Sequence, residues 1–222
     1  MKYFPDKYTL RARVFPTTLG VLPFIFIFKF VPIDTIFLKI TVGGVVSSAL
    51  IYLATHAIRI PAKMFEDWLF SSGLHMPTTN LLLYRDSYYD EQTKDKIRLK
   101  IKSDFDITLF TKDEEVLDEV AARRKIKDAT KFIINRIKDG HLVLKHNYEY
   151  GFFRNFWSAS IVGLFSSILL LLVSLAHASN LFVYLALFLS VLYMSYIMFG
   201  FLLIRYVGTL YARKLIEEYY ES

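Results

Sequence analysis

The side chains best able to do chemistry lie in and just after one short segment, residues 73–86, with the sequence GLHMPTTNLLLYRD. His75, Asp86, Asp90 and Glu91 offer the nitrogen and oxygen ligands of a metal site. A solvated helix face explains them better, because no ligand spacing recurs elsewhere and carboxylates four residues apart are common on helix surfaces. Residues 73–86 are interpreted first as a joint between two parts of the chain and second as a ligand contact. The predicted residues of this joint segment are Gly73, Pro77, Thr78, Thr79, Arg85 and Asp86.

Two runs of basic residues follow the joint segment. The first is Lys94, Lys96, Arg98, Lys100 and Lys102, and the second is Arg123, Arg124, Lys125 and Lys127. Closely spaced cations favour phosphate-rich partners such as nucleotides, nucleic acid or lipid headgroups. The simpler explanation is ordinary cytoplasmic charge beside an anionic membrane leaflet. These two basic strips are the predicted contacts for a nucleotide ligand or a soluble protein partner.

The sequence lacks the residues that several classes of enzyme require. The chain has no cysteine, which excludes a thiol nucleophile, a zinc–thiolate site and an iron–sulfur cluster. It also has no phosphate-cradling glycine loop, no G-x-S-x-G elbow and no H-E-x-x-H pair. We therefore expect that the chain is not an enzyme and uses neither a cofactor nor a metal.

The elements that position these residues include four apolar runs. The 222 residues are 54% hydrophobic, and the mean hydropathy of +0.35 is too high for a soluble domain of this size. Four runs are long enough to cross a bilayer core, which needs about 20 apolar residues with some tolerance below that: 14–30, 36–58, 156–176 and 181–204. The predicted fold is an all-α membrane protein, with two transmembrane hairpins separated by a mostly helical cytosolic module. The predicted domains are 1–58, 59–155, 156–204 and a cytosolic tail, 205–222.

Lysine and arginine set the orientation, because they concentrate in cytoplasmic connections. Only Lys29 and Lys39 lie near the connection 31–36, and neither residue type occurs in the connection 176–181. We expect both connections to face outward and both termini to be cytoplasmic. The first run has no small-x-small cleavage pattern and is expected to stay as an uncleaved helix. Lys39 is expected to snorkel to the membrane interface.

Small residues recur every four positions in two of the spans: Gly43, Gly44, Ser47 and Ser48 in the second, and Ala159, Gly163 and Ser167 in the third. This spacing predicts close helix packing, within one chain or in a homo-oligomer. The alternative is that the serines line a conduit. The spans hold almost no ionisable residue, which disfavours a coupled transporter. Pro16 suits the first turn of its helix, whereas Pro23 is expected to kink or shorten it.

The module itself is expected to be mostly helical. An amphipathic helix should run from Pro61 to Gly73, and Thr78 or Thr79 should cap the next helix. Residues 97–110 fit a strand or a helix, and helix is favoured. One long helix should run from a capping Thr111 to a stop at Gly140. Its predicted buried stripe is Val116, Val120, Ala121, Ile126, Ala129, Phe132, Ile133 and Ile137.

The segment before the third span is expected to be a short strand or an extended leg over residues 141–150, with a turn at Gly151. Residues 147–155, NYEYGFFRN, would couple the module to the membrane helices. The predicted coupling residues are Tyr150, Gly151, Arg154 and Asn155, with Arg154 at the lipid headgroups.

These segments carry a resemblance. The G-x-P-T-T-like, D-x-x-T-K and Y-G-F-x-R-N segments of residues 73–155 resemble an uncharacterised family of bacterial multi-pass inner-membrane proteins. His75 and Met76 make the first segment one residue longer than that pattern. The resemblance implies a location in the bacterial inner membrane and no particular activity.

The predicted architecture is also similar to that of small membrane effectors of antiphage systems, in which a cytosolic module senses a signal and the membrane helices respond. The first hypothesis is therefore an oligomeric, channel-like effector gated at its module. The alternative is a passive membrane anchor or scaffold that recruits a soluble partner.

Overall fold

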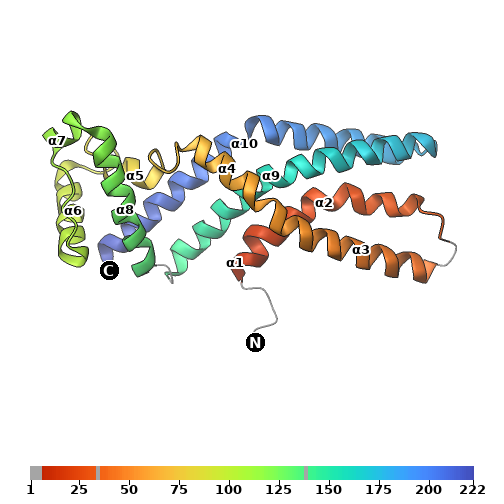
Figure 1. Cartoon of the computed structure of the whole chain (residues 1–222), viewed down its shortest axis with the longest axis horizontal. Coiled ribbons are helices and arrows are strands. Elements are labelled where there is room, and N and C mark those ends of the chain that lie inside the picture. The colour runs from red at the N-terminus through yellow and green to blue at the C-terminus, as the bar shows by residue number, and fades with distance from the viewer. Residues whose placement is uncertain (1–6, 34–35, 138–139) are drawn as a thin grey trace. The chain divides into compact units, whose positions relative to one another are not determined.

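The computed structural model describes residues 7–33, 36–137 and 140–222 (Figure 1). Part of the 31–36 connection, the side chain of Lys39 and the two residues before the predicted stop at Gly140 lie outside this description. The described residues form helices and contain no strand, so the all-α prediction is confirmed. Residues 97–110 accordingly begin in a helix and end in an irregular segment after Phe105.

Four helical segments are long and apolar enough to cross a membrane, as the sequence predicted. They are Lys7–Phe30, Ile40–Leu69, Val143–Ala176 and Asn180–Glu221. Their lengths and compositions are those of a multi-pass membrane protein. The chain divides into two compact units: Met1–Met64 with Gly151–Ile204, and Phe65–Tyr150 with Arg205–Ser222.

The first unit begins with α1 (Lys7–Thr9), a π-helical turn η1 (Leu10–Val14), α2 (Phe15–Ile27) and a 3₁₀ turn η2 (Phe28–Phe30). α3 (Ile36–Ala57) packs along α2, as Figure 1 shows. The first part of α4 (Arg59–Leu69), up to Met64, follows, and the unit also contains most of α9 (His141–Ala176) and the first part of α10 (Asn180–Glu221). Trp157 and Tyr196 join α9 to α10 by hydrogen bonds to backbone carbonyls, of 3.0 Å each.

Pro16 leaves one backbone carbonyl without its α-helical donor, and a side chain of another helix replaces that donor. A proline has no N–H, so it cannot donate the α-helical hydrogen bond to the carbonyl four residues earlier, that of Ala12. Asn155 of α9, fully buried, donates its Nδ2 to that carbonyl at 2.6 Å. The helices come close here because Gly151 has no side chain: an added Cβ would lie 2.9 Å from the Cβ of Ala12. Gly151 lies inside α9, so the predicted turn at Gly151 is wrong.

Pro23, which also lies in α2, has the same effect, and here the replacement donor comes from α10. α2 continues past it to Ile27, and the proline leaves the carbonyl of Leu19 without an α-helical donor. The hydroxyl of Tyr193, on α10, donates to that carbonyl at 2.6 Å. In a bilayer core, where no water replaces a missing donor, such a bond is the available way to satisfy the carbonyl.

The small residues of the third predicted span are buried. Ala159 faces Gly20, where an added Cβ would lie 2.4 Å from the Ala159 carbonyl oxygen. Gly163 faces the ring of Tyr193, and Ser167 hydrogen bonds to Ser190 at 2.9 Å. Within this chain, the third-span set therefore packs against α2 and α10. In the second span Gly43 and Ser47 are buried, whereas Gly44 and Ser48 are exposed.

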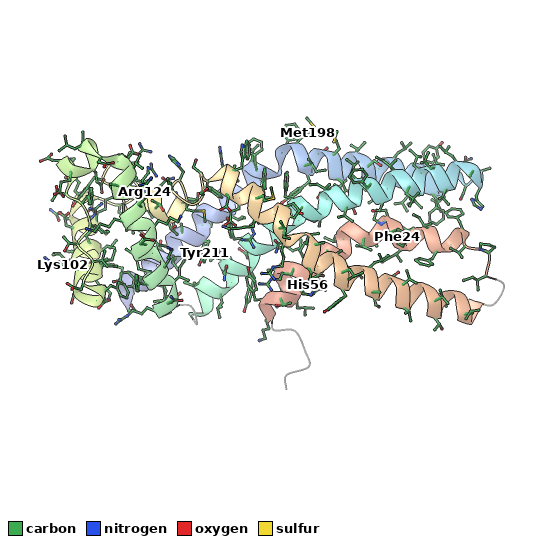
Figure 2. The ribbon with its side chains drawn as sticks, in the orientation of Figure 1. Phe24, His56, Lys102, Arg124, Met198 and Tyr211 are labelled. Atoms are coloured by element: carbon green, nitrogen blue, oxygen red, sulfur yellow. The ribbon has the colours of Figure 1, made fainter. Side chains whose placement is uncertain are left out.

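The second unit has α5 (Pro77–Leu82), α6 (Glu91–Phe105), α7 (Lys112–Leu117) and α8 (Glu119–Ile137), with the start of α9 and the end of α10. Its core joins Leu81–Leu83 and the buried faces of α6 and α8 to residues of α10. The α10 members are Tyr211, Ala212, Leu215, Ile216 and Tyr219. Tyr211, labelled in Figure 2, also stacks on Tyr150 with ring centroids 6.2 Å apart. Residues 205–222 are thus a wall of this unit's core.

The single helix predicted from Thr111 is two helices. Thr111 does cap α7, in a reciprocal capping box with Glu114. The helix then breaks at Asp118, whose carboxylate caps α8 by accepting from the Ala121 N–H at 2.9 Å. The break shifts the register of the predicted stripe, so Val116 is 82% exposed. Val120 and Phe132 are also exposed, and the residues of α8 that are buried are Ala122, Arg123, Ile126, Ala129, Thr130, Ile133 and Ile137.

Two further expectations are wrong. Neither Thr78 nor Thr79 caps α5: the N-cap is Met76, because Pro77 at the first helical position starts the helix earlier. Residues 141–150 are helical rather than extended, since α9 begins at His141 and the Leu144 N–H bonds to the Gly140 carbonyl at 2.9 Å. No proline interrupts this segment, so the helix continues into the third span.

Candidate ligand-binding site

The joint segment begins in a tight turn between α4 and α5. α4 ends at Leu69, four residues before the predicted stop, and the chain then turns through Ser71, Ser72 and Gly73, all with positive φ. Gly73 has a φ of 87°, which favours glycine. Few carbonyls of the joint segment bond within a regular helix, so they need donors from elsewhere in the protein.

The predicted basic strips supply those donors. Arg123, 2% exposed, donates from Nη1 to the carbonyl of Leu74 and to Asn80 Oδ1, both at 2.8 Å. Lys127 donates to the Ser72 carbonyl at 2.8 Å, and its aliphatic chain covers Gly73. The second basic strip therefore points partly inward and holds the joint segment in place.

Lys94 and Arg98 hold the other end of the joint segment. Lys94 is 1% exposed and donates to the carbonyls of Tyr84, at 3.2 Å, and Asp86. Burial lowers the pKa of this lysine. Arg98 donates to the Leu82 carbonyl at 2.5 Å, to the Phe110 carbonyl and to the buried carboxylate of Glu115. In this conformation the two buried cations are occupied by the protein itself.

Tyr84 lies beside Arg98, whose guanidinium is 4.0 Å from the centre of the tyrosine ring. Its N–H donates to Glu115 at 2.9 Å and its hydroxyl donates to Asp95. Burial, together with the hydrogen bond to Asp95, raises the pKa of the Tyr84 hydroxyl to about 12. These contacts make Tyr84 part of the packing around Arg98 and Glu115.

Asp90 explains part of the D-x-x-T-K segment. Its carboxylate caps α6 by accepting from the Thr93 N–H at 2.7 Å and the Thr93 hydroxyl at 3.0 Å. These hydrogen bonds lower the pKa of Asp90. Within the described residues, no group of three His, Cys, Asp or Glu is placed to hold a metal.

The remaining basic-strip residues lie at or near the surface. Lys96, Lys102 and Arg124 are exposed, and Figure 2 labels Lys102 on α6 and Arg124 on α8. Lys100 and Lys125 are half-buried and lie over the rings of Tyr219 and Phe110. Arg85, of the joint segment, is exposed and pairs with Glu119 at 2.8 Å. These residues are the part of the predicted contact set that a partner can reach.

A cavity of about 390 Å³ opens beside the joint segment, inside the second unit. One wall is made by the joint segment and its neighbours, and the other by α10. This joint cavity is lined by Leu69, Phe70, His75, Pro77, Asn80, Leu81, Asp86, Tyr88, Arg205, Thr209 and Arg213. Its size is in the range of small-molecule sites. The structure thus adds a charged α10 face to the segment that the sequence singled out.

Arg213 is the most distinctive residue of the joint cavity. Its guanidinium stacks on the ring of Tyr88 at 4.1 Å from the centroid. Its Nε is buried and has no hydrogen-bond partner among the described residues. Tyr88 is held in turn, since its N–H donates to Asp86 Oδ1 at 2.9 Å and its hydroxyl to Glu217 at 3.3 Å. The stacking fixes the plane of the guanidinium and leaves donor edges available.

Sequence reasoning did not identify the α10 residues of the joint cavity. Arg205, Thr209 and Arg213 were part of a segment treated only as a cytosolic tail. Their four-residue spacing was the available signal, because it places three side chains on one face of a helix. The buried residues Val207, Tyr211 and Ala212 alternate with them along the sequence and conceal that polar face in the one-dimensional pattern.

Comparisons with models of protein families, with curated proteins and with solved structures give no match to this chain, so the geometry of the site carries the functional argument.

Proposed function

We propose that the protein is a non-enzymatic, oligomeric effector of the bacterial inner membrane, channel-like and gated by a ligand at its second unit. Both termini and the second unit lie in the cytoplasm in this proposal, in keeping with the distribution of lysine and arginine. Small antiphage membrane effectors, which this architecture resembles, work in this way.

One observation carries the proposal. The polar wall of the joint cavity, Arg205, Thr209 and Arg213, belongs to α10, the helix whose earlier part is the fourth candidate span. A ligand that binds this wall acts on the same helix that crosses the membrane. Ligand binding shifts a conformational equilibrium only through different affinities for two states, and a helix shared by site and span provides such a difference.

The test is dye and ion leakage from liposomes that contain the purified full-length chain. Mono-, di- and cyclic nucleotides are added as probes of the trigger. The expected result is leakage that a nucleotide starts and that Arg213→Gln abolishes, while Lys145→Gln, a change at an exposed lysine, leaves it intact. Absence of leakage with every probe, together with an unchanged membrane potential in cells that express the chain, contradicts the effector.

A second candidate, a scaffold that recruits a soluble protein, has its own supporting observation. Val116, Leu117 and Val120 are 82%, 85% and 50% exposed around the α7–α8 break. The exposed carboxylates of Asp113, Glu114 and Asp118 border this apolar patch. A partner with an apolar centre and a basic rim would fit it. Replacement of Val116 and Leu117 by serine would then abolish capture of that partner without any change in membrane permeability.

A further inference from the structure

The wall that α10 contributes to the joint cavity has the spacing of an anion-binding face. Arg205, Thr209 and Arg213 follow one another at four-residue steps, so they project from one side of the helix. Eight residues span about 12 Å along a helix axis. Two guanidinium groups at the ends of that span suit an elongated anionic ligand better than a single small ion.

Arg213 has the chemistry that such a ligand needs. No ion pair of Arg213 is found among the described residues, and its guanidinium stacks on the ring of Tyr88 with its Nε buried and unbonded. A guanidinium held in one plane presents parallel N–H groups that match two oxygens of a phosphate. Because the stacking has already restricted the side chain, less conformational entropy is lost on binding.

The opposite wall is polar and fixed. Arg123 donates to Asn80 Oδ1 at 2.8 Å, and this bond fixes the orientation of the Asn80 amide. The Nδ2 of the same amide donates one long bond, of 3.4 Å, to the His75 carbonyl. Asp86 brings an acceptor into the same cavity, with Oδ1 bound to the Tyr88 N–H. A carboxylate repels a bare phosphate ion but accepts hydrogen bonds from hydroxyl or amino groups.

We propose that the joint cavity binds a small phosphate ester, with its phosphate on Arg213, its length along the α10 face toward Arg205, and a donor-bearing end, such as a sugar or a nucleobase, on Asp86. This assignment rests on the proposed function, because it names the chemistry of the trigger. It places the ligand in the cavity rather than on the exposed basic strips.

A phosphate ester can reach the cavity from two sources. It is either a soluble metabolite, such as a nucleotide or a sugar phosphate, or the headgroup of an anionic lipid. The recognition chemistry is the same for both, since each offers phosphate oxygens and hydroxyl donors. The two sources are separated by the composition of the membrane in which the protein is studied.

The experiment measures binding to the full-length chain in nanodiscs of zwitterionic lipid, by calorimetry and by thermal unfolding. The probes are inorganic phosphate, AMP, GMP and glucose 6-phosphate, with adenosine and guanosine as ligands that lack the phosphate. A second set of nanodiscs contains anionic lipid and no soluble probe. Leakage from liposomes of the same preparation is recorded separately.

At least one phosphate ester is expected to bind and to raise the unfolding temperature, whereas its nucleoside does not. Arg213→Gln and Arg213→Lys should weaken this binding about tenfold or more, the lysine because it cannot bind in a bidentate manner. Lys145→Gln, which alters an exposed lysine outside the cavity, should leave it unchanged. Asp86→Asn should strengthen binding of inorganic phosphate and weaken binding of the ester, because it removes the repulsion and the acceptor charge together.

If anionic lipid alone stabilises the chain and Arg213→Gln removes that effect, the phosphate site is supported and its ligand is a lipid headgroup. The proposal is overturned if neither esters nor anionic lipid act through Arg213. It is also overturned if binding survives Arg213→Gln and disappears in a Lys96→Gln, Lys102→Gln, Arg124→Gln variant. Arg213-dependent binding without leakage would support the phosphate site and contradict the gated effector. Leakage without Arg213-dependent binding would support the effector and contradict the phosphate site.

Discussion

At the residue scale, the recurring theme is a carbonyl that lacks its ordinary donor and a side chain that replaces it. Proline creates the need at Ala12 and Leu19, and the irregular joint segment creates it at Leu74, Leu82, Tyr84 and Asp86. A buried carbonyl without a donor costs about 1–3 kcal/mol. The residues that meet these needs are therefore expected to be sensitive to substitution, although none of them lines the joint cavity.

Tyr193→Phe should lower the free energy of unfolding by about 1–2 kcal/mol, because it removes the hydroxyl donor to the Leu19 carbonyl. The loss should shrink in a Pro23→Ala background, because residue 23 then has an N–H of its own for that carbonyl. Unfolding in mixed detergent micelles measures this double-mutant cycle. Equal losses in the natural and the Pro23→Ala backgrounds would show that the tyrosine acts by packing instead.

Lys94→Met should lower the free energy of unfolding by about 1–3 kcal/mol, since two carbonyls of the joint segment lose their shared ammonium donor. The matched control is Lys96→Met, two residues along on the exposed side of α6, expected to change stability by less than about 0.5 kcal/mol. Thermal unfolding of the two variants distinguishes them. Similar behaviour of both would place Lys94 among the surface cations.

At the element scale, capping divides the second unit into its helices. Asp90 caps α6, the Thr111–Glu114 box caps α7, and Asp118 both ends α7 and caps α8. The Asp118 break decides which side chains of 112–137 are buried, and it leaves Val116 and Leu117 in solvent. A periodicity that ignores the break combines two helices into one stripe, and this is why the predicted stripe was half wrong.

The cap of α6 predicts a pH dependence. Hydrogen bonds from Thr93 hold the pKa of Asp90 below its ordinary value of 3.8, so the carboxylate stabilises the fold above that pH. The stabilisation is lost as the pH falls through the lower pKa of the folded state. The difference in unfolding temperature between the natural chain and Asp90→Asn should therefore shrink as the pH is lowered below about 3.8. Asp113→Asn, at an exposed residue that is not a helix cap, serves as the control for the change from aspartate to asparagine.

At the scale of the whole molecule, the two compact units are discontinuous in sequence. The second unit takes residues 65–150 and 205–222, so its core closes only when the end of the chain is present. The first unit likewise combines the beginning of the chain with residues 151–204. Neither unit can be cut from the sequence as one piece.

A chain that ends at Ile204 should leave residues 65–150 unfolded, because it lacks Tyr211, Ala212, Leu215, Ile216 and Tyr219 of their core. Limited proteolysis should then cleave within 65–150 at a protease concentration that the full chain resists. A chain that ends at Tyr220 keeps all five residues and serves as the control. Equal resistance of all three chains would show that residues 65–150 fold independently of α10.

The sequence by itself determined the properties that depend on local composition. Apolar runs of bilayer length identified four long apolar helices, and Thr111 before a run of acidic residues identified the start of a helix. The joint segment was also recognisable, because Gly73 and Pro77 constrain the backbone whatever lies around them. These features need no information from distant parts of the chain.

Only the tertiary structure decided what the polar residues do. Lys94, Arg98 and Arg123 look like surface cations in a linear pattern, yet they are buried against carbonyls 8 to 49 residues away. Arg205, Thr209 and Arg213 looked like a tail, yet they form a wall of the joint cavity with residues 69–88. The physical reason is the same in each case. Whether a charged side chain contacts water, a carbonyl or a cavity depends on which distant segment packs beside it, and local composition does not determine that packing.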